Sequence, residues 1–361
     1  MIDSILGRQA TMQTDAIAGA ILGCAVGDAM GLSYEGLSRR RGARLLGEPT
    51  RHRFILGHGM VSDDTEHTCM VALALGEHPR DVDAFARTFA WHLRTWLLGL
   101  PAGIGFATLR AIVKLWLGFP PARSGVFSAG NGPAMRSAIL GAAIDDASEL
   151  SHFVRAATLI THSDPKAYEG ALAVALAAWC ARRGIHNLAE FLAHFRRAAG
   201  ESASDEFLAL LLAVEESVAA EQSTLDFAAR IGCGNGISGY IYHTVPVALH
   251  CWLSHPENYR DAIDEIIRCG GDTDTTAAIV GAIIGSGVGR EGIPTAWREG
   301  LWEWPRSKAW MEKLAAALEL AIRTGKRAPF PRIFPLIGLA RNAVFLAAVF
   351  VHIAHRLLPP Y

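Results

Sequence analysis

Two stretches of this 361-residue sequence carry a glycine at every fourth position, and this spacing constrains the fold more than any other feature. The positions are Gly19, Gly23, Gly27 and Gly31 in one stretch, and Gly281, Gly285 and Gly289, with Ala277 in phase, in the other. Glycine inside a helix costs up to about 1 kcal/mol relative to alanine, so in-phase glycines need a packing reason. Residues four apart share one side of a helix, where glycines let another backbone approach closely. We therefore expect two central, tightly packed helices that hold the acidic segments described below near one another. The alternative is that each helix packs against a different neighbour.

Helical periodicity extends over almost the whole chain. Apolar residues recur at intervals of three and four, whereas sustained alternation of β-branched and polar residues is nearly absent. The pattern predicts helices at 82–98, 134–144, 149–161, 167–183, 187–199, 204–219, 225–231, 239–253, 259–268 and 310–323. Glycine and proline predict loops at 32–61, 99–105, 117–132, 232–238 and 287–306. The sequence therefore predicts an all-α protein, whose long first loop suggests a binding element.

Composition and charge exclude several classes of protein. Apolar residues make up 51% of the chain and charged residues 19%, which predicts a large core and argues against disorder. A formal net charge of −1 gives no support for binding to nucleic acid. The six scattered cysteines lack a C-x-x-C pair, so we expect reduced core thiols in a cytoplasmic protein. Residues 1–15 contain no apolar run, so no secretory signal is expected.

One local exception is an arginine-rich segment in the predicted first loop, comprising Arg39, Arg40, Arg41, Arg44, Arg51 and Arg53. A solvated surface is the favoured interpretation of this segment, ahead of a contact with phosphate or a partner protein.

The C-terminus raises the question of membrane association. An apolar run of 14 residues lies between Arg341 and Arg356, whereas a spanning helix needs about 20. Extending the run backwards would bury Arg341 and cross Pro335. We expect a helix packed on the domain, then a dimer contact, then a peripheral membrane anchor, in that order. The predicted division is a catalytic domain at 1–325 and a linker with an apolar helical appendage at 326–361.

Two short acidic segments carry the chemistry: S-D-D-T at 62–65 and G-D-T-D-T at 271–275, each just before an apolar helical run. Adjacent carboxylates repel one another, and their desolvation is costly unless a cation neutralises them. Oxygen ligands of this kind favour magnesium, manganese or calcium over zinc. Ordinary helix capping produces similar residues. Because two such helix starts occur together, a shared divalent-metal site is favoured over capping alone.

Two other interpretations of the second segment can be checked in the sequence. An EF-hand starting at Asp272 would need glycine and glutamate where Ala277 and Ile283 stand, which excludes it. The D-x-D-x-T signature of aspartyl-phosphate phosphatases is present, but an amphipathic helix at 262–268 precedes it instead of a buried strand. A metal-dependent phosphohydrolase therefore stays a weak alternative.

Further motifs appear in a fixed order along the chain. They are G-x-x-x-G-D-A-M-G-L-S-Y-E at 23–35, S-D-D-T at 62–65, G-N-G-P-A-M-R at 130–136, Thr161-His162 and G-D-T-D-T at 271–275. Over roughly residues 15–320 the chain thereby resembles the ADP-ribosylglycohydrolase family. That family includes the bacterial hydrolases that reactivate dinitrogen reductase and the animal ADP-ribosyl-acceptor hydrolases. The resemblance implies a compact orthogonal helical bundle with a binuclear Mg²⁺ or Mn²⁺ centre at helix N-termini.

The resemblance also implies roles for individual residues. The implied metal ligands are Ser62, Asp63, Asp64, Asp272, Asp274 and Thr275. Glu35, on a loop over the metals, would act in catalysis together with Asp63 and Asp274. The implied substrate-binding residues are Ser128, Gly130, Asn131, Gly132, Arg136, His162 and Tyr240. Asp28 is expected to support the site or pack its helix.

The implied reaction is hydrolysis of the glycosidic bond between ADP-ribose and an acceptor, with ADP-ribosyl-arginine on a protein as the favoured substrate. Alternatives are serine-linked ADP-ribose, O-acetyl-ADP-ribose, or a binding protein that gives immunity by blocking an ADP-ribosyltransferase toxin.

Overall fold

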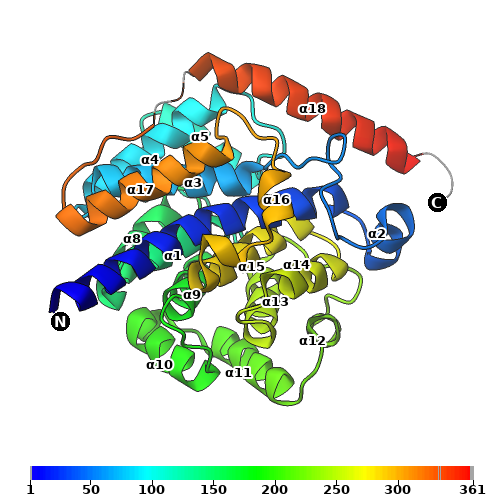
Figure 1. The fold of residues 1–361 in the computed structure, drawn as a ribbon, viewed down its shortest axis with the longest axis horizontal. Helices are drawn as coiled ribbons and strands as arrows, with labels where there is room; N and C mark the ends of the chain where they lie inside the picture. The colour runs from blue at the N-terminus through cyan, green and yellow to red at the C-terminus, as the bar shows by residue number, and fades with distance from the viewer. Residues whose placement is uncertain (1, 332, 334, 358–361) are drawn as a thin grey trace.

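Helices α1 (Ile2–Gly31) and α15 (Thr273–Val288) run antiparallel through the centre of the protein (Figure 1). The structure is a computed structural model that describes residues 2–331, 333 and 335–357. A Cβ atom added to Gly23 would lie 2.1 Å from the carbonyl oxygen of Gly281, closer than side chains tolerate. The predicted close packing is confirmed, and each glycine-lined helix is the partner of the other. We call this contact the glycine seam. It places the end of α1 beside the start of α15, where Thr273 Oγ1 donates to the Gly31 carbonyl at 2.9 Å.

The predicted all-α class is confirmed, since β-structure in the described part of the chain is limited to isolated bridges. The remaining helices are α2 (Arg39–Leu46), α3 (Asp63–Glu77), α4 (Val82–Leu97), α5 (Phe106–Trp116), α6 (Pro121–Ser124), α7 (Ala138–Ala143), α8 (Ala147–Leu159), α9 (Pro165–Ala181), α10 (Leu188–Ala199), α11 (Asp205–Ala219), α12 (Thr224–Arg230), α13 (Ile241–Ser254), α14 (Tyr259–Arg268), α16 (Thr295–Glu299), α17 (Lys308–Thr324) and α18 (Pro335–Leu357). Short 3₁₀ turns span Leu32–Tyr34, Ala134–Arg136, Gly200–Ser202 and Arg290–Gly292.

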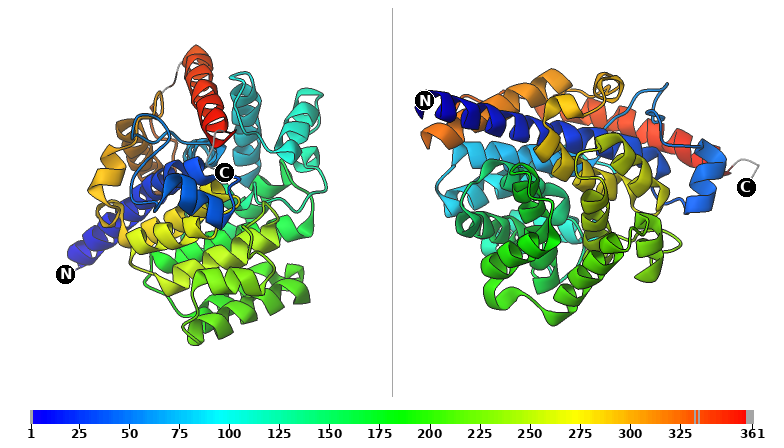
Figure 2. Two further views of the ribbon diagram at one scale, coloured as in Figure 1. Left: turned by 90° about the vertical axis from the view of Figure 1, so that its right-hand side faces the viewer. Right: turned by 60° about the horizontal axis from the view of Figure 1, so that its bottom comes forward.

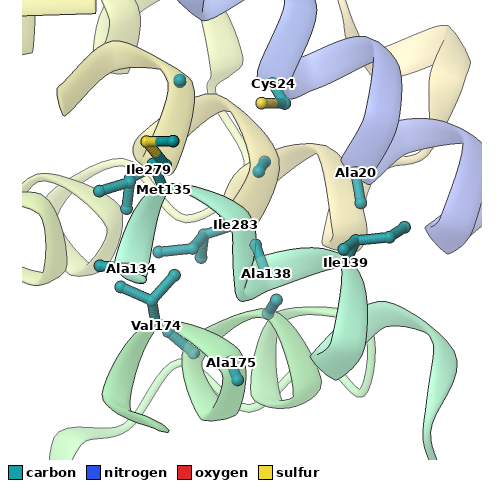
Figure 3. Packing of buried hydrophobic residues seen from close by; sticks show 14 of the residues in the cluster. Ala20, Cys24, Ala134, Met135, Ala138, Ile139, Val174, Ala175, Ile279 and Ile283 are labelled. Atoms are coloured by element: carbon teal, nitrogen blue, oxygen red, sulfur yellow. The ribbon is translucent and has the colours of Figure 1, made fainter. Parts of the chain in front are cut away.

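Small side chains fill the core around the seam and bring the helices close together. Figure 3 shows α7 and the 3₁₀ turn before it lying between α15 and α9. A Cβ on Gly141 of α7 would lie only 1.8 Å from the Ala175 carbonyl oxygen of α9. Every residue of α9 from Ala167 to Ala181 is buried. The start of α15 therefore rests on a close-packed support.

Three predicted loops contain helices instead. The arginine-rich part of 32–61 forms α2, while α6 and α16 interrupt 117–132 and 287–306. Helix α2 contains few apolar residues, so apolar periodicity does not predict it. Tyr34 holds it in place: its ring lies near Gly42, and its hydroxyl donates to the Gly47 carbonyl at 3.1 Å. The predicted helix at 134–144 is in fact a 3₁₀ turn followed by α7. All six cysteines are buried and free, as predicted.

The C-terminal helix α18 spans 23 residues and is longer than the apolar run suggested. Pro335 occupies its first position, where proline is tolerated, and Arg341 is buried against the domain. Helix α18 crosses the upper side of the molecule in Figure 1, beyond α4 and α17. Among the described residues, two helical segments are long and apolar enough to cross a membrane, judged by length and hydropathy alone: 15–34, fully buried inside the protein, and 337–357, of which 22% is buried.

Candidate functional site

The N-termini of α3 and α15 meet at a cavity of about 370 Å³, which we call the acidic cavity. Its lining includes Asp63 from α3, and Asp272, Asp274 and Thr275 at the start of α15. Asp64 lies next to them, since Thr275 Oγ1 donates to its carboxylate at 3.3 Å. The two acidic segments, about two hundred residues apart in sequence, are therefore brought together.

Asp28 of α1 holds the start of α3 in place. Its buried carboxylate accepts hydrogen bonds from the backbone N–H groups of Ser62 (2.9 Å) and Thr65 (3.2 Å) and from the Thr65 hydroxyl (2.6 Å). Burial raises the pKa of Asp28 to about 7. Ser62 adds the side-chain cap of α3 by accepting from the Asp64 backbone N–H at 3.2 Å. Asp28 thus fixes α3 against the glycine seam without lining the cavity.

The cavity concentrates negative charge. Burial raises the pKa of Asp63, Asp64 and Asp274 well above the usual carboxylate range, and repulsion from neighbouring carboxylates raises each further. One oxygen of Asp64 and one of Asp274 are buried without a hydrogen-bond partner in the described structure. Among the described residues, the lining contains no lysine or arginine. Glu66 is separate, because Trp96 Nε1 (2.6 Å) and Arg306 satisfy its carboxylate.

This arrangement fits hard divalent cations. The predicted ligand atoms are carboxylate and hydroxyl oxygens, the ligand type that such cations prefer, and one oxygen each of Asp64 and Asp274 has no hydrogen-bond partner among the described residues. Within the described ranges, no three or more His, Cys, Asp or Glu groups stand close enough to enclose a metal ion by themselves. The predicted hydroxyl ligands lie beside the carboxylates, since Ser62 Oγ (2.8 Å) and Thr275 Oγ1 both donate to Asp64. The donor chemistry matches magnesium or manganese.

A glycine-flanked turn, Gly130–Gly132, also lines the cavity. Asn131 donates its side-chain amide to Asp272 at 2.7 Å and to Thr244 at 3.0 Å. The backbone N–H of Asn131 donates to the Gly239 carbonyl at 2.9 Å. The turn therefore orients the carboxylate of Asp272. The backbone N–H groups of Gly130 and Gly132 make no hydrogen bond to a described residue. Such free donors can receive a phosphate.

His162 packs against this turn and explains its two glycines. A Cβ on Gly130 or Gly132 would lie 3.2 or 3.1 Å from the imidazole ring. Burial, with a smaller effect of Arg136, lowers the pKa of His162 to about 3. The ring is therefore neutral at physiological pH, and its Nδ1 lies 2.9 Å from the Thr161 hydroxyl. Ser128 also lines the cavity, as predicted for a substrate-binding residue.

Glu35 lies at the rim of the cavity. Loss of hydration and the charge of Asp272 raise the pKa of its carboxyl group. The following residue, Gly36, donates its backbone N–H to the Gly271 carbonyl at 2.8 Å, which ties this segment to the start of α15. A carboxyl group with a raised pKa at this position can hold a proton for transfer.

Two of the predicted substrate-binding residues do not line the cavity. Arg136 does not line the cavity: it is 1% exposed, donates to the Ala157 carbonyl and Thr161, and lies over the Phe89 ring. Tyr240 lies outside the lining as well, and its hydroxyl accepts a hydrogen bond from Lys166 at 3.1 Å. Both side chains have partners within the protein, and their roles in substrate binding stay predictions.

Other lining residues were not predicted from the sequence. Phe106 and Thr108 at the start of α5, together with Met135 and Gly239, complete the wall of the cavity. Phe106 is 74% exposed. Two local signals point to this wall: the predicted glycine-rich loop at 99–105, which leads into α5, and the motif at 130–136, which contains Met135.

Comparisons with known proteins give a consistent picture. A family model described as ADP-ribosylglycohydrolase matches residues 9–328. An uncharacterized protein of Archaeoglobus fulgidus is 32% identical over 321 residues, covering 85% of this chain and 97% of that protein. ADP-ribosylhydrolase ARH3 of Mus musculus is 29% identical over 214 residues, covering 50% of this chain and 56% of that protein.

Two further matches cover most of the chain. ADP-ribosyl-(dinitrogen reductase) glycohydrolase of Rhodospirillum rubrum is 28% identical over 298 residues, covering 78% of this chain and 89% of that protein. A solved structure of an ADP-ribosylglycohydrolase-related protein complex aligns with a TM-score of 0.62 at 26% identity, covering 86% of this chain and 99% of that one.

Proposed function

Because the chain belongs to the ADP-ribosylglycohydrolase family, we propose that it hydrolyses the bond between ADP-ribose and an acceptor group with the help of two divalent cations, Mg²⁺ or Mn²⁺. The observation that carries this proposal is the convergence of two distant acidic helix starts on one cavity whose buried carboxylate oxygens lack partners.

Six residues would hold the cations: Ser62, Asp63, Asp64, Asp272, Asp274 and Thr275. Bound there, the cations would neutralise the carboxylates and supply a water molecule of lowered pKa. The protein contributes the geometry. Asp28 fixes the start of α3, and the Asn131 amide orients Asp272. The free N–H groups of the Gly130–Gly132 turn are placed to receive the diphosphate.

The acceptor group must take up a proton as it leaves, and Glu35 is the residue that we assign to this step. Its raised pKa increases the fraction of protonated carboxyl near neutral pH. A general acid works best when its pKa lies near the working pH. Its position at the rim leaves room for an acceptor that is part of a protein.

Arginine is the first candidate acceptor. The described lining contains no lysine or arginine that would repel a guanidinium group. A hydroxyl acceptor such as serine is the second candidate, because the relatives named ADP-ribosylhydrolase ARH3 are not named for arginine.

The proposal is tested by incubating the full chain with peptides ADP-ribosylated on arginine or on serine, with Mg²⁺, Mn²⁺ or a chelator. We expect release of free ADP-ribose that requires a metal. Asp63→Ala and Asp274→Ala should lower the rate by more than about 100-fold, beyond the loss typical of residues that only support metal ligands. Asp83→Ala, at an exposed position in the first turn of α4, is the matched control and should leave the rate unchanged.

Undiminished release by Asp63→Ala and Asp274→Ala would refute the site assignment. Phosphate release without free ADP-ribose would indicate a phosphohydrolase. Binding of ADP-ribose without turnover would indicate a binding protein, such as one that blocks an ADP-ribosyltransferase toxin.

A further inference from the structure

Helix α18 exposes apolar residues to solvent, whereas an ordinary surface helix exposes polar ones. Within 337–357, the part of α18 whose burial the structure describes, thirteen residues are exposed and twelve of these are apolar: Ile337, Leu339, Ala340, Ala343, Val344, Leu346, Ala347, Phe350, Val351, Ile353, Ala354 and Leu357, with His355 as the exception. A surface helix normally presents charged and polar residues to water. The segment 337–357 has a mean hydropathy of 1.8 and is only 22% buried. This outer face of α18 lies beyond the residues matched by the family model.

Four polar residues of α18 bond to the domain and fix the orientation of the helix: Arg341, Asn342, His352 and Arg356. Near its start, Arg341 forms a buried ion pair with Glu303 at 2.7 Å and donates to the Val61 carbonyl. Near its end, Arg356 donates to the carbonyls of Ser33 and Glu35, both at 2.9 Å. The helix is therefore held flat on the domain at both ends, and its apolar face is directed outwards by specific bonds.

The apolar surface continues onto two neighbouring loops. Asn342 donates to the Gly99 carbonyl at 2.7 Å, so the exposed Leu98 and Leu100 flank the start of α18. His352 donates to the Phe54 carbonyl at 2.7 Å, in the segment that ends at Leu56, which is 91% exposed. An exposed apolar area of this extent on a folded protein marks an interaction surface.

Unpaired positive charge borders one end of this surface. Arg41 of α2 donates to the Arg356 carbonyl at 3.3 Å, which places α2 at the C-terminal end of α18, and Figure 2 shows the two side by side. The exposed arginines of α2 and the segment after it make no ion pair among the described residues: Arg39, Arg40, Arg41, Arg44 and Arg51. The local charge is strongly positive although the formal net charge of the whole chain is −1.

We propose that the outer face of α18, with Leu56, Leu98 and Leu100, docks flat onto a membrane surface that contains anionic lipids. An apolar helix face with adjacent arginines is the pattern of a helix that lies in the membrane interface. The twelve apolar residues offer no side-chain hydrogen bond, whereas protein interfaces carry about one hydrogen bond per 100–200 Å² and are enriched in polar anchors such as arginine and tyrosine. The inward bonds at both ends oppose insertion across the bilayer.

Docking in this orientation has a consequence for the acidic cavity. Arg356 contacts the backbone of Glu35, and Glu35 lies at the cavity rim. The rim is therefore held close to the lipid surface, where acceptors on membrane-associated proteins would meet it. The docking itself rests on α18 and does not depend on the proposed hydrolase activity.

The test is flotation of the full chain with vesicles of phosphatidylcholine alone or of phosphatidylcholine mixed with phosphatidylglycerol. We expect binding to the anionic vesicles that weakens as salt is added. Val351→Glu and Phe350→Glu place a charge on the outer face and should lower the fraction bound at least tenfold. Leu212→Glu, at an exposed apolar position on α11, is the matched control and should bind as the unsubstituted chain does.

Circular dichroism and activity on a soluble substrate check that the Val351 and Phe350 variants stay folded. Reversal of the arginines in Arg40→Glu/Arg44→Glu should remove the preference for anionic vesicles. Failure of the unsubstituted chain to float with either vesicle would overturn the proposal. So would equal flotation of Val351→Glu, or a dimer in solution that Val351→Glu dissociates while vesicles remain unbound.

Discussion

Gly23→Ala would place a methyl group inside the glycine seam, where it would meet the backbone of α15. The added Cβ would lie 2.1 Å from the Gly281 carbonyl oxygen, whereas ordinary contact begins at 3.4 Å. Both groups belong to helix backbones, so no side chain can rotate away. Helices α1 and α15 would have to separate by roughly 1.3 Å, the difference between these two distances.

Gly23→Ala changes the free energy of unfolding in two opposite ways, through helix propensity and through overpacking of the seam. Alanine in place of a helical glycine gains up to about 1 kcal/mol. Overpacking a close-packed contact costs typically about 1–3 kcal/mol, and more when backbone must move. We expect Gly23→Ala to lower the free energy of unfolding by about 2 kcal/mol net. With an unfolding entropy of about 2.1 cal/mol/K per residue, this corresponds to a melting temperature about 3 °C lower for a domain of roughly 320 residues.

Gly338→Ala is the matched control, because a Cβ at Gly338 of α18 meets nothing within 4 Å. This variant should raise the free energy of unfolding by up to about 1 kcal/mol. Urea unfolding of both variants measures the difference. If Gly23→Ala stabilises the protein as much as Gly338→Ala does, the seam does not restrict side-chain size and the reasoning fails.

Three further substitutions have defined outcomes. Ser62→Ala removes the cap of α3 and should lower the free energy of unfolding, measured without metal, by about 1 kcal/mol. The hydrogen bond to Glu265 raises the pKa of His255, so its stabilisation is present below the unfolded pKa of about 6.5 and is lost as the pH rises through the folded pKa. His255→Gln should therefore lose more stability at about pH 6 than at about pH 9, and equal losses would contradict this. Arg341→Met leaves Glu303 buried and unpaired, and should cost about 3–5 kcal/mol in urea unfolding, part of which Glu303→Gln in the same chain restores.

Structural features that depend on residues within one short segment could be predicted from the sequence. The glycines at every fourth position predicted close helix packing, because residues without a side chain, such as Gly23 and Gly281, let the backbone of another helix approach. The interpretation that the two helices bring the acidic segments together was favoured over packing against other neighbours, and the structure confirms their contact. The helix starts could also be predicted from a local pattern, because Ser62 and Asp272 stand directly before α3 and α15.

Features that depend on distant partners could not be predicted. Arg136 looked available to a substrate because its partners, Thr161 and Phe89, are far away in the sequence. The length of α18 was underestimated because the apolar run stops at Arg341, whose charge is compensated by Glu303 from a separate segment. Phe106 lines the cavity without belonging to any motif.

The antiparallel seam limits how this protein can change during evolution. Each residue of a helix turns the chain by about 100°. A single insertion in α1 between Gly19 and Asp28 would rotate the remaining glycines away from α15 and withdraw Asp28 from the start of α3. Surface connections can grow or shrink among homologues, but the number of residues along this stretch of α1 must stay constant.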